Sequence, residues 1–119
     1  MQPAHLDLEI YKGSTFSKQI QWKTGTPAVP VNLTGYSARM QVRKSVNDST
    51  ILDSLTTENN RLTIYTPTEG RLRIDVAADI SSAYEFTSAV YDLELVAPDN
   101  ITVYRILEGC YSANPEVTR

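Results

Sequence analysis

The chain has 119 residues with 11 basic and 14 acidic side chains, a net charge of −3, and a 41% hydrophobic composition. This size and composition fit one globular domain, and the acidic balance argues against binding to nucleic acid or anionic lipid. No apolar run approaches the about 20 residues of a membrane-spanning helix, and residues 1–7 lack the pattern of a secretory signal, so we expect neither.

Apolar and polar residues alternate along most of the chain, which is the pattern of half-buried β-strands. In chain order, the predicted strands are residues 6–11, 16–22, 36–43, 51–55, 61–65, 71–76, 89–96 and 101–108, with a brief pairing at 110–113. Glycines, prolines and asparagines between them predict turns, and residues 23–30 predict an exposed loop. Lys18 falls on the apolar side of its strand, so it is expected either to extend its charged end to solvent or to lie near a sheet edge.

The alternation breaks only at residues 77–86. Asp79 is placed there to cap a helical turn across residues 80–84, the one helix that we expect. Seven to eight short strands at roughly ten-residue spacing predict an all-β fold, an antiparallel β-sandwich of immunoglobulin-like type. The Cys-Trp-Cys signature of antibody domains is absent, and no linker divides the chain, so we expect a single domain over residues 1–119.

The sequence has few side chains that could act in catalysis or bind a metal. Cys110 is the only cysteine and His5 the only histidine, so an intrachain disulfide is impossible and the two residues show no metal-ligand spacing. The single cysteine fits a reducing compartment. A catalytic base would have to be His5, which lies in a segment expected to fray, and no nucleophile elbow or phosphate-binding loop occurs. We therefore expect no enzymatic activity, no metal and no cofactor.

Two groups of charged residues lie on predicted strands. Asp92 and Glu94 would share one strand face, with Arg105 close by on the next strand. They predict a cross-strand ion pair, with calcium binding or acid–base chemistry as the alternative. Arg39 and Arg43 would also share a face, where they form either a weak basic patch or an ordinary solvated surface.

Aromatic residues are numerous, with seven tyrosines and one tryptophan. Their strand parity predicts that Trp22, Tyr36 and Tyr91 pack in the core, while Tyr11, Tyr65 and Tyr104 face outward. The outward tyrosines suit a protein–protein contact. A sugar-stacking platform, formed by Trp22 with Tyr11 or Tyr104, is the alternative.

Six segments of the sequence resemble small tailed-bacteriophage virion proteins, in the same order along nearly the whole chain. They include Leu-Thr-Gly before the strand at 36–43 and Tyr-Asp-Leu within the strand at 89–96. The likeness is to the β-sandwich domain that begins phage baseplate upper proteins and related tail-module proteins. The segments are residues 10–16, 31–43, 68–74, 90–95, 105–109 and 116–119.

The resemblance implies a non-enzymatic structural component of the virion, made in the host cytoplasm. In the family, this domain is an adaptor that fixes receptor-binding parts to the tail, so a tail or baseplate location is favoured. The expected partners are other virion proteins and copies of this chain. The larger family members continue into helical and fibre-like regions, whereas this sequence ends at Arg119, so a capsid decoration or head/neck role stays open. Glycan binding for host-surface recognition is a further alternative.

Both ends lack an alternating apolar pattern and are candidate assembly arms that cross onto neighbouring subunits. Pro115 cannot donate to a β-ladder, so the chain is expected to leave the sheet there. The alternative is that both ends fold back on their own domain. The candidate arm residues are Met1, Gln2, Pro3, Pro115, Glu116, Val117, Thr118 and Arg119.

Overall fold

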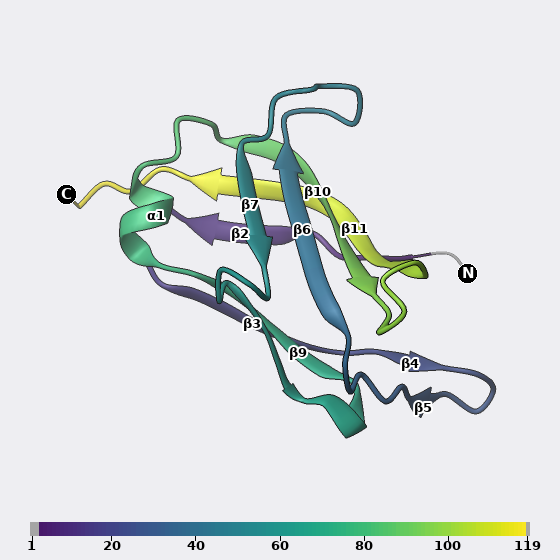
Figure 1. Ribbon diagram of the computed structural model, residues 1–119. Coiled ribbons are helices and arrows are strands. Elements are labelled where there is room, and N and C mark those ends of the chain that lie inside the picture. The colour runs from purple at the N-terminus through teal and green to yellow at the C-terminus, as the bar shows by residue number, and fades with distance from the viewer. Residues whose placement is uncertain (1–2, 119) are drawn as a thin grey trace.

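The computed structural model describes residues 3–118, and two β-sheets dominate it (Figure 1). The strands are β1 (Ala4–His5), β2 (Leu8–Tyr11), β3 (Phe16–Gln21), β4 (Lys23–Thr24), β5 (Val29–Pro30), β6 (Ser37–Arg43), β7 (Asp53–Thr56), β8 (Leu62–Thr66), β9 (Arg71–Val76), β10 (Ser88–Val96) and β11 (Val103–Asn114). The helices are a 3₁₀ turn, η1 (Pro67–Glu69), and one α-helical turn, α1 (Ala78–Ser82). Within residues 3–118, no helix is long and apolar enough to cross a membrane.

The strand order is that of an immunoglobulin-type sandwich. The large sheet runs β1-β11-β10-β6-β7, with β2 also paired to β11, and the small sheet runs β3-β9-β8. In chain order, β1 and β2 lie in the large sheet, β3 in the small sheet, β6 and β7 in the large sheet, β8 and β9 in the small sheet, and β10 and β11 in the large sheet, as in variable-type immunoglobulin domains. The predicted all-β sandwich is confirmed. All strand pairs are antiparallel except those of β1 and β2, which run parallel to β11.

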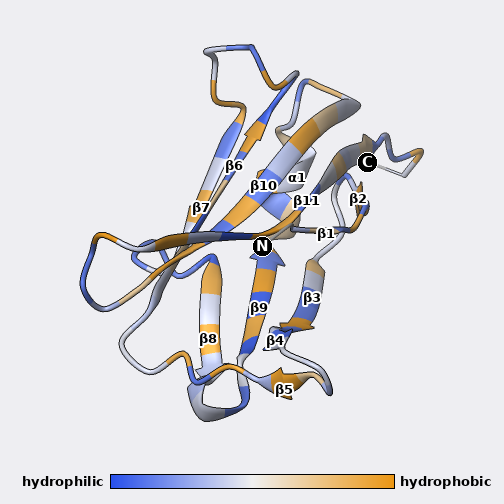
Figure 2. Ribbon diagram, turned by 90° about the vertical axis from the view of Figure 1, so that its right-hand side faces the viewer, coloured by the Kyte–Doolittle hydropathy of each residue, from blue (hydrophilic) through white to orange (hydrophobic). Residues whose placement is uncertain are grey.

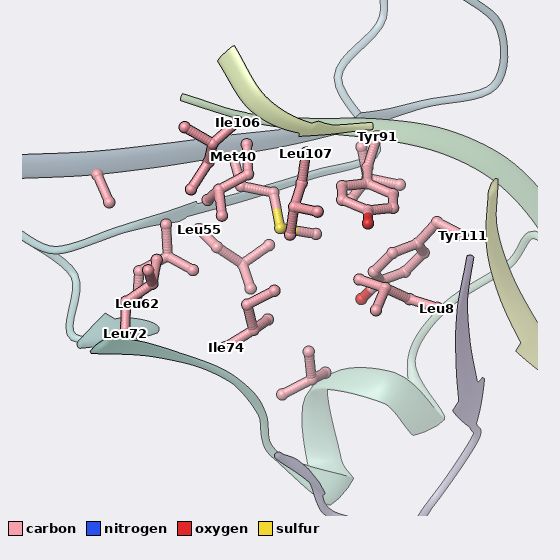
Figure 3. Close-up of a cluster of buried hydrophobic side chains, with 14 of the residues drawn as sticks. Leu8, Met40, Leu55, Leu62, Leu72, Ile74, Tyr91, Ile106, Leu107 and Tyr111 are labelled. Carbon is pink, nitrogen blue, oxygen red and sulfur yellow. The ribbon is translucent and has the colours of Figure 1, made fainter. Parts of the chain in front are cut away.

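The period-two pattern produces the core directly. Along β6 and β9, buried and solvent-facing residues alternate without interruption, as the hydropathy colouring in Figure 2 also shows for β9. The inward side chains of the two sheets meet in one apolar layer (Figure 3). Tyr111, Leu72, Ile74 and Leu93 are each completely buried. Burial of such side chains stabilises the fold by about 1.5–3 kcal/mol each.

Strand β11 differs from its prediction in length and in parity. It is one continuous strand of 12 residues that passes through Gly109 rather than pausing there. Its pairing with β10 shifts register between Leu93 and Glu94, so that Ile106 is an extra residue, a β-bulge. Both Ile106 and Leu107 are buried as a result, and the alternation changes parity at that point.

A helical turn forms in the expected region, but it covers Ala78–Ser82, two residues earlier than predicted, and Asp79 does not cap it. The residue before the first turn is Ala77, which makes no side-chain cap hydrogen bond, and Asp79 lies inside the helix. The polar contact that holds this turn comes from Ser81, which is completely buried. Its hydroxyl accepts a hydrogen bond from the Gly13 N–H at 3.1 Å, and this contact ties α1 to the β2–β3 loop.

The loop predicted at residues 23–30 is exposed. It contains the hairpin β4–β5, in which each strand is two residues long. The Thr26–Pro27 peptide bond at its tip is cis. Lys18 lies on an edge strand, one of the two predicted arrangements, because β3 pairs only with β9 in the small sheet.

The two ends are more ordered than their sequence predicts. Ala4 and His5 pair with Leu107 and Glu108, so the expectation that this segment frays is wrong from Ala4 onward. The reason is that β11 offers a free edge on which even a polar segment forms backbone hydrogen bonds.

At the other end, the structure ends the β11 strand at Asn114, directly before Pro115, as predicted. Glu116 then lies against Gly13 of the same chain, while Val117 is 95% exposed. Of the candidate arm residues, Met1, Gln2 and Arg119 lie outside the described residues.

Gly70 is the residue on which one end of the sandwich depends. Its φ of +67° and its surroundings both require glycine, because an added Cβ would lie 2.6 Å from the Trp22 carbonyl oxygen and 2.8 Å from that of Val31. We expect Gly70→Ala to lower the free energy of unfolding by about 3 kcal/mol, from left-handed strain plus the steric conflict. Urea unfolding followed by circular dichroism measures the loss.

Gly25→Ala is the matched control. Gly25 also has a positive φ, of +91°, but its Cβ would meet only the Pro27 carbonyl oxygen, at 3.6 Å. Strain alone should cost about 1 kcal/mol there. Equal losses in the two variants would show that the close approach at Gly70 does not matter.

Candidate interaction surface

The outer face of the large sheet, which points away from the core, holds a concavity. Its volume is about 760 Å³, and β6, β10, β11 and β1 supply its walls. We call this surface the outer face. Its charged and polar side chains are His5, Arg39, Gln41, Arg43, Asp92, Glu94, Arg105, Glu108 and Cys110.

Ion pairs between neighbouring strands order this face. Arg39 Nε donates to Glu94 Oε1 at 2.8 Å across β6 and β10, and Arg105 Nε lies 3.3 Å from Asp92 Oδ2 across β10 and β11. Arg105 also lies 3.8 Å from Glu108. The cross-strand ion pair predicted with Arg105 is present for Asp92, whereas Glu94 pairs with Arg39 of β6 instead. Exposed pairs of this kind contribute only about 0.2–1 kcal/mol each, so their main effect is to hold the side chains in place.

Asp92 is the least favourably ionised group on the outer face. Its partial burial raises the pKa of its carboxyl, and the nearby carboxylates of Glu94 and Glu108 raise it further, against the opposing effect of Arg105. Its side chain is 39% exposed and paired with Arg105, so both water and the guanidinium stabilise the carboxylate.

The structure brings Arg39 and Arg43 to this one face, as their spacing predicts. Arg43 is engaged locally, because it donates to the Asp48 carbonyl oxygen and to Gln41 Oε1, both at 2.8 Å. The two arginines therefore form part of a mixed-charge surface and not an isolated basic patch.

The three tyrosines expected to face outward do not gather. Tyr11 is 56% exposed on β2, and Tyr65 is half-buried on β8 with the Arg73 guanidinium 6.0 Å from its ring centre. The prediction for Tyr104 is wrong: it is half-buried on the core side of β11. The bulge at Ile106 is the physical reason. Unbroken alternation would put Tyr104 and Leu107 on opposite faces of the strand, but the extra residue Ile106 puts both on the core side.

Tyr104 packs instead against Trp22, with ring centroids 5.3 Å apart and planes tilted by 50°. Both rings contact the core and are only partly exposed, which leaves little ring face for stacking with a sugar. Tyr11 pairs with Asn114 at the opposite end of β11, so Tyr11 and Trp22 do not form one platform. This arrangement disfavours the glycan-binding alternative.

Three chemically notable residues come together, of which Cys110 is far in sequence from His5 and Asp7. Asp7 Oδ1 lies 2.9 Å from His5 Nε2 and accepts a hydrogen bond from the Cys110 N–H, also at 2.9 Å. That backbone hydrogen bond is the main cause of a lowered Asp7 pKa. Nothing in the sequence signals this contact, which arises from the pairing of β1 with β11. Within residues 3–118, no group of three or more metal-ligating side chains occurs.

Sequence reasoning also missed a buried polar cluster, which we call the Asp53 cluster: Asp53, Arg61, Tyr84 and Tyr111. Arg61 donates to both carboxylate oxygens of Asp53, at 2.6 and 2.7 Å, and the side chains are only 17% and 13% exposed. The Tyr84 hydroxyl donates to Asp53 Oδ2 and lies 2.8 Å from the Tyr111 hydroxyl. The cluster joins β7, the start of β8, the loop after α1 and β11.

Ionisation in the Asp53 cluster follows from its hydrogen bonds. Burial raises the pKa of Asp53, but the hydrogen bonds from Arg61 and Tyr84 outweigh burial and hold the pKa below its usual value. Burial, together with the hydrogen bond to Asp53, raises the pKa of Tyr84. Burial likewise raises the pKa of Tyr111 to about 12. At neutral pH the cluster therefore holds one carboxylate, one guanidinium and two neutral phenols.

No protein-family model and no curated protein matches this chain.

The lowered pKa of Asp53 predicts a specific loss of stability in acid. A carboxyl with a folded-state pKa below its unfolded value contributes fully above the unfolded pKa, and the contribution disappears as pH falls through the folded pKa. Asp53→Asn should therefore lower the free energy of unfolding by about 3 kcal/mol at neutral pH. The difference from wild type should shrink between about pH 4 and about pH 2.

Urea unfolding of both proteins across that pH range measures the effect. Asp79→Asn is the control, because it removes an exposed carboxylate from α1. A difference between wild type and Asp53→Asn that stays constant down to about pH 2 would contradict the role assigned to the Asp53 charge.

Proposed function

We propose that this chain is a non-enzymatic structural component of a bacteriophage virion, which acts by docking to other virion proteins. The proposal rests on the resemblance of its six segments to phage tail-module domains. An immunoglobulin-type sandwich is compatible with that resemblance, since the family domain is also a β-sandwich. A tail or baseplate adaptor is the favoured position in the particle.

The outer face is the observation that supports docking best. Its charged side chains are held in register by cross-strand ion pairs, so little side-chain entropy is left to lose on binding. It combines a shallow concavity with both signs of charge, and mixed charge favours specificity for a complementary partner. These properties fit a protein partner better than a small-molecule substrate, whose sites are mostly apolar and enclosed.

A capsid decoration or head/neck position involves the same docking chemistry. It differs only in where the chain lies on the particle. Labelling of purified particles with an antibody to this chain, followed by electron microscopy, separates the two positions. Absence of the chain from intact particles would contradict both.

Charge reversal on the outer face should impair assembly without unfolding the domain. In Glu94→Arg/Glu108→Arg, two carboxylates beside Arg39 and Arg105 become positive, which removes the complementarity of the face. We expect about tenfold less of this variant than of wild type in purified particles, measured by quantitative mass spectrometry. The melting temperature should fall by only about 5 °C, because exposed ion pairs contribute little.

The double variant Glu58→Arg/Glu85→Arg carries the same change of net charge on exposed residues outside the outer face. It should be incorporated at the wild-type level. Equal incorporation of both double variants would show that the outer face is not the docking surface.

The assembly-arm hypothesis predicts another variant that keeps its stability but loses incorporation into particles. Asn114 accepts a hydrogen bond from the Lys12 N–H at 2.9 Å and must be kept, so the deletion should remove only residues 115–119. We expect a melting temperature within about 3 °C of wild type, because residues 115–118 belong to no strand, together with reduced incorporation into particles. A truncated chain that unfolds, or that is incorporated normally, would contradict the arm.

A further inference from the structure

Strand β3 has one edge without a partner. Its six residues pair with β9 on one side, and no strand of residues 3–118 pairs with the other. At β7, an edge strand of the large sheet, the Asn59 side chain bonds the backbone of Ser54 and Thr56. The β3 edge has no comparable cover, and Ser17, Lys18 and Gln19 form a run of exposed residues there.

The register tells which backbone groups point outward. Trp22 donates its N–H to the Gly70 carbonyl oxygen at 2.8 Å, in line with the β3–β9 pairing of Gln21 with Arg71. Because hydrogen-bonded and non-hydrogen-bonded pairs alternate in an antiparallel ladder, every second residue before Trp22 bonds β9. Ser17, Gln19 and Gln21 therefore direct their N–H and C=O groups toward the open edge.

Lys18 determines what kind of strand can add to this edge. It shares the inward face with Phe16 and Ile20, yet it is exposed because its strand is at the edge. An inward-pointing charge on an edge strand opposes pairing with an identical strand, since the lysines of two copies would approach each other. Dimerisation through pairing of β3 with the β3 strand of a second copy is thus disfavoured.

All charged side chains of β3 and of the residues that flank it in sequence are positive. Residues 12–23 contain Lys12, Lys18 and Lys23 and no carboxylate. None of the ion pairs within residues 3–118 involves a lysine. Two carboxylates of the small sheet, Asp75 and Glu69, are engaged by arginines of β9. The Glu116 carboxylate lies against Gly13, beside Lys12, which leaves Lys18 and Lys23 to pair with a carboxylate from outside.

We propose that the β3 edge accepts an extended, acidic segment of a different protein as an added strand of the small sheet. Backbone hydrogen bonds to Ser17, Gln19 and Gln21 supply the pairing, and a carboxylate opposite Lys18 supplies the selectivity. Apolar residues on either side of that carboxylate cover Phe16 and Ile20. This inference deepens the proposed docking function by naming a second docking site and the chemistry of its partner.

A palindromic peptide, Thr-Val-Thr-Glu-Thr-Val-Thr with blocked ends, is the probe. In either strand direction it places its glutamate opposite Lys18 and its valines opposite Phe16 and Ile20. Titration into the ¹⁵N-labelled full chain should give saturable shifts at β3, with a Kd at or below about 1 mM, and slower amide exchange at Ser17 and Gln19. The same peptide with a central lysine should bind at least about fivefold more weakly.

Two substitutions locate the binding. Gln19→Pro removes an outward N–H and is tolerated on an edge strand, so it should abolish peptide binding while the domain stays folded, whereas Gln19→Ala should bind as wild type. Lys18→Glu should reverse the preference toward the lysine peptide. No saturable binding up to about 1 mM, or binding unaffected by Gln19→Pro, overturns the proposal. The test uses isolated protein, so it stays informative even if the chain proves absent from particles.

Discussion

The buried pair between Asp53 and Arg61 is the contact on which the two-sheet arrangement most depends. Asp53 belongs to the large sheet and Arg61 opens the small sheet, so their bidentate hydrogen bonds fix the two sheets relative to each other at one edge. Tyr84 and Tyr111 complete the set of hydrogen bonds, which satisfies a carboxylate that would otherwise be costly to bury. Arg61 also bonds the Ser54 carbonyl oxygen, so the same side chain helps to close the β7 edge.

With one side of the sandwich closed in this way, the surfaces available for contact are those that remain. The long β11 strand shapes one of them, the outer face. The bulge at Ile106 lets Tyr104 and Leu107 both face the core, and it leaves Arg105 on the outer face beside Asp92. A single inserted residue thus determines both the packing at one end of the core and the charge pattern of the outer face.

Most of the fold could be predicted from the sequence because the two-residue alternation of a β-strand is visible in a few consecutive residues. The β6 and β9 patterns can be read from a few residues, and each strand forms where it was expected. What failed depends on contacts between distant segments. The bulge at Ile106 reverses Tyr104 only because β11 is registered on β10, and Asp7 meets Cys110 only because the strands on either side of Asp7 pair with β11. The Asp53 cluster likewise joins four elements and leaves no periodic signal.

The parallel pairing of β2 with β11 has a mechanical consequence. Ala4 and Asn114 lie toward opposite ends of the molecule, where Figure 1 shows the two termini pointing apart. A force that pulls the two ends of the chain apart therefore acts along these strands and loads their backbone hydrogen bonds together, in shear, instead of opening them one at a time. A module built in this way transmits tension along its length while its sheet faces and its β3 edge stay intact.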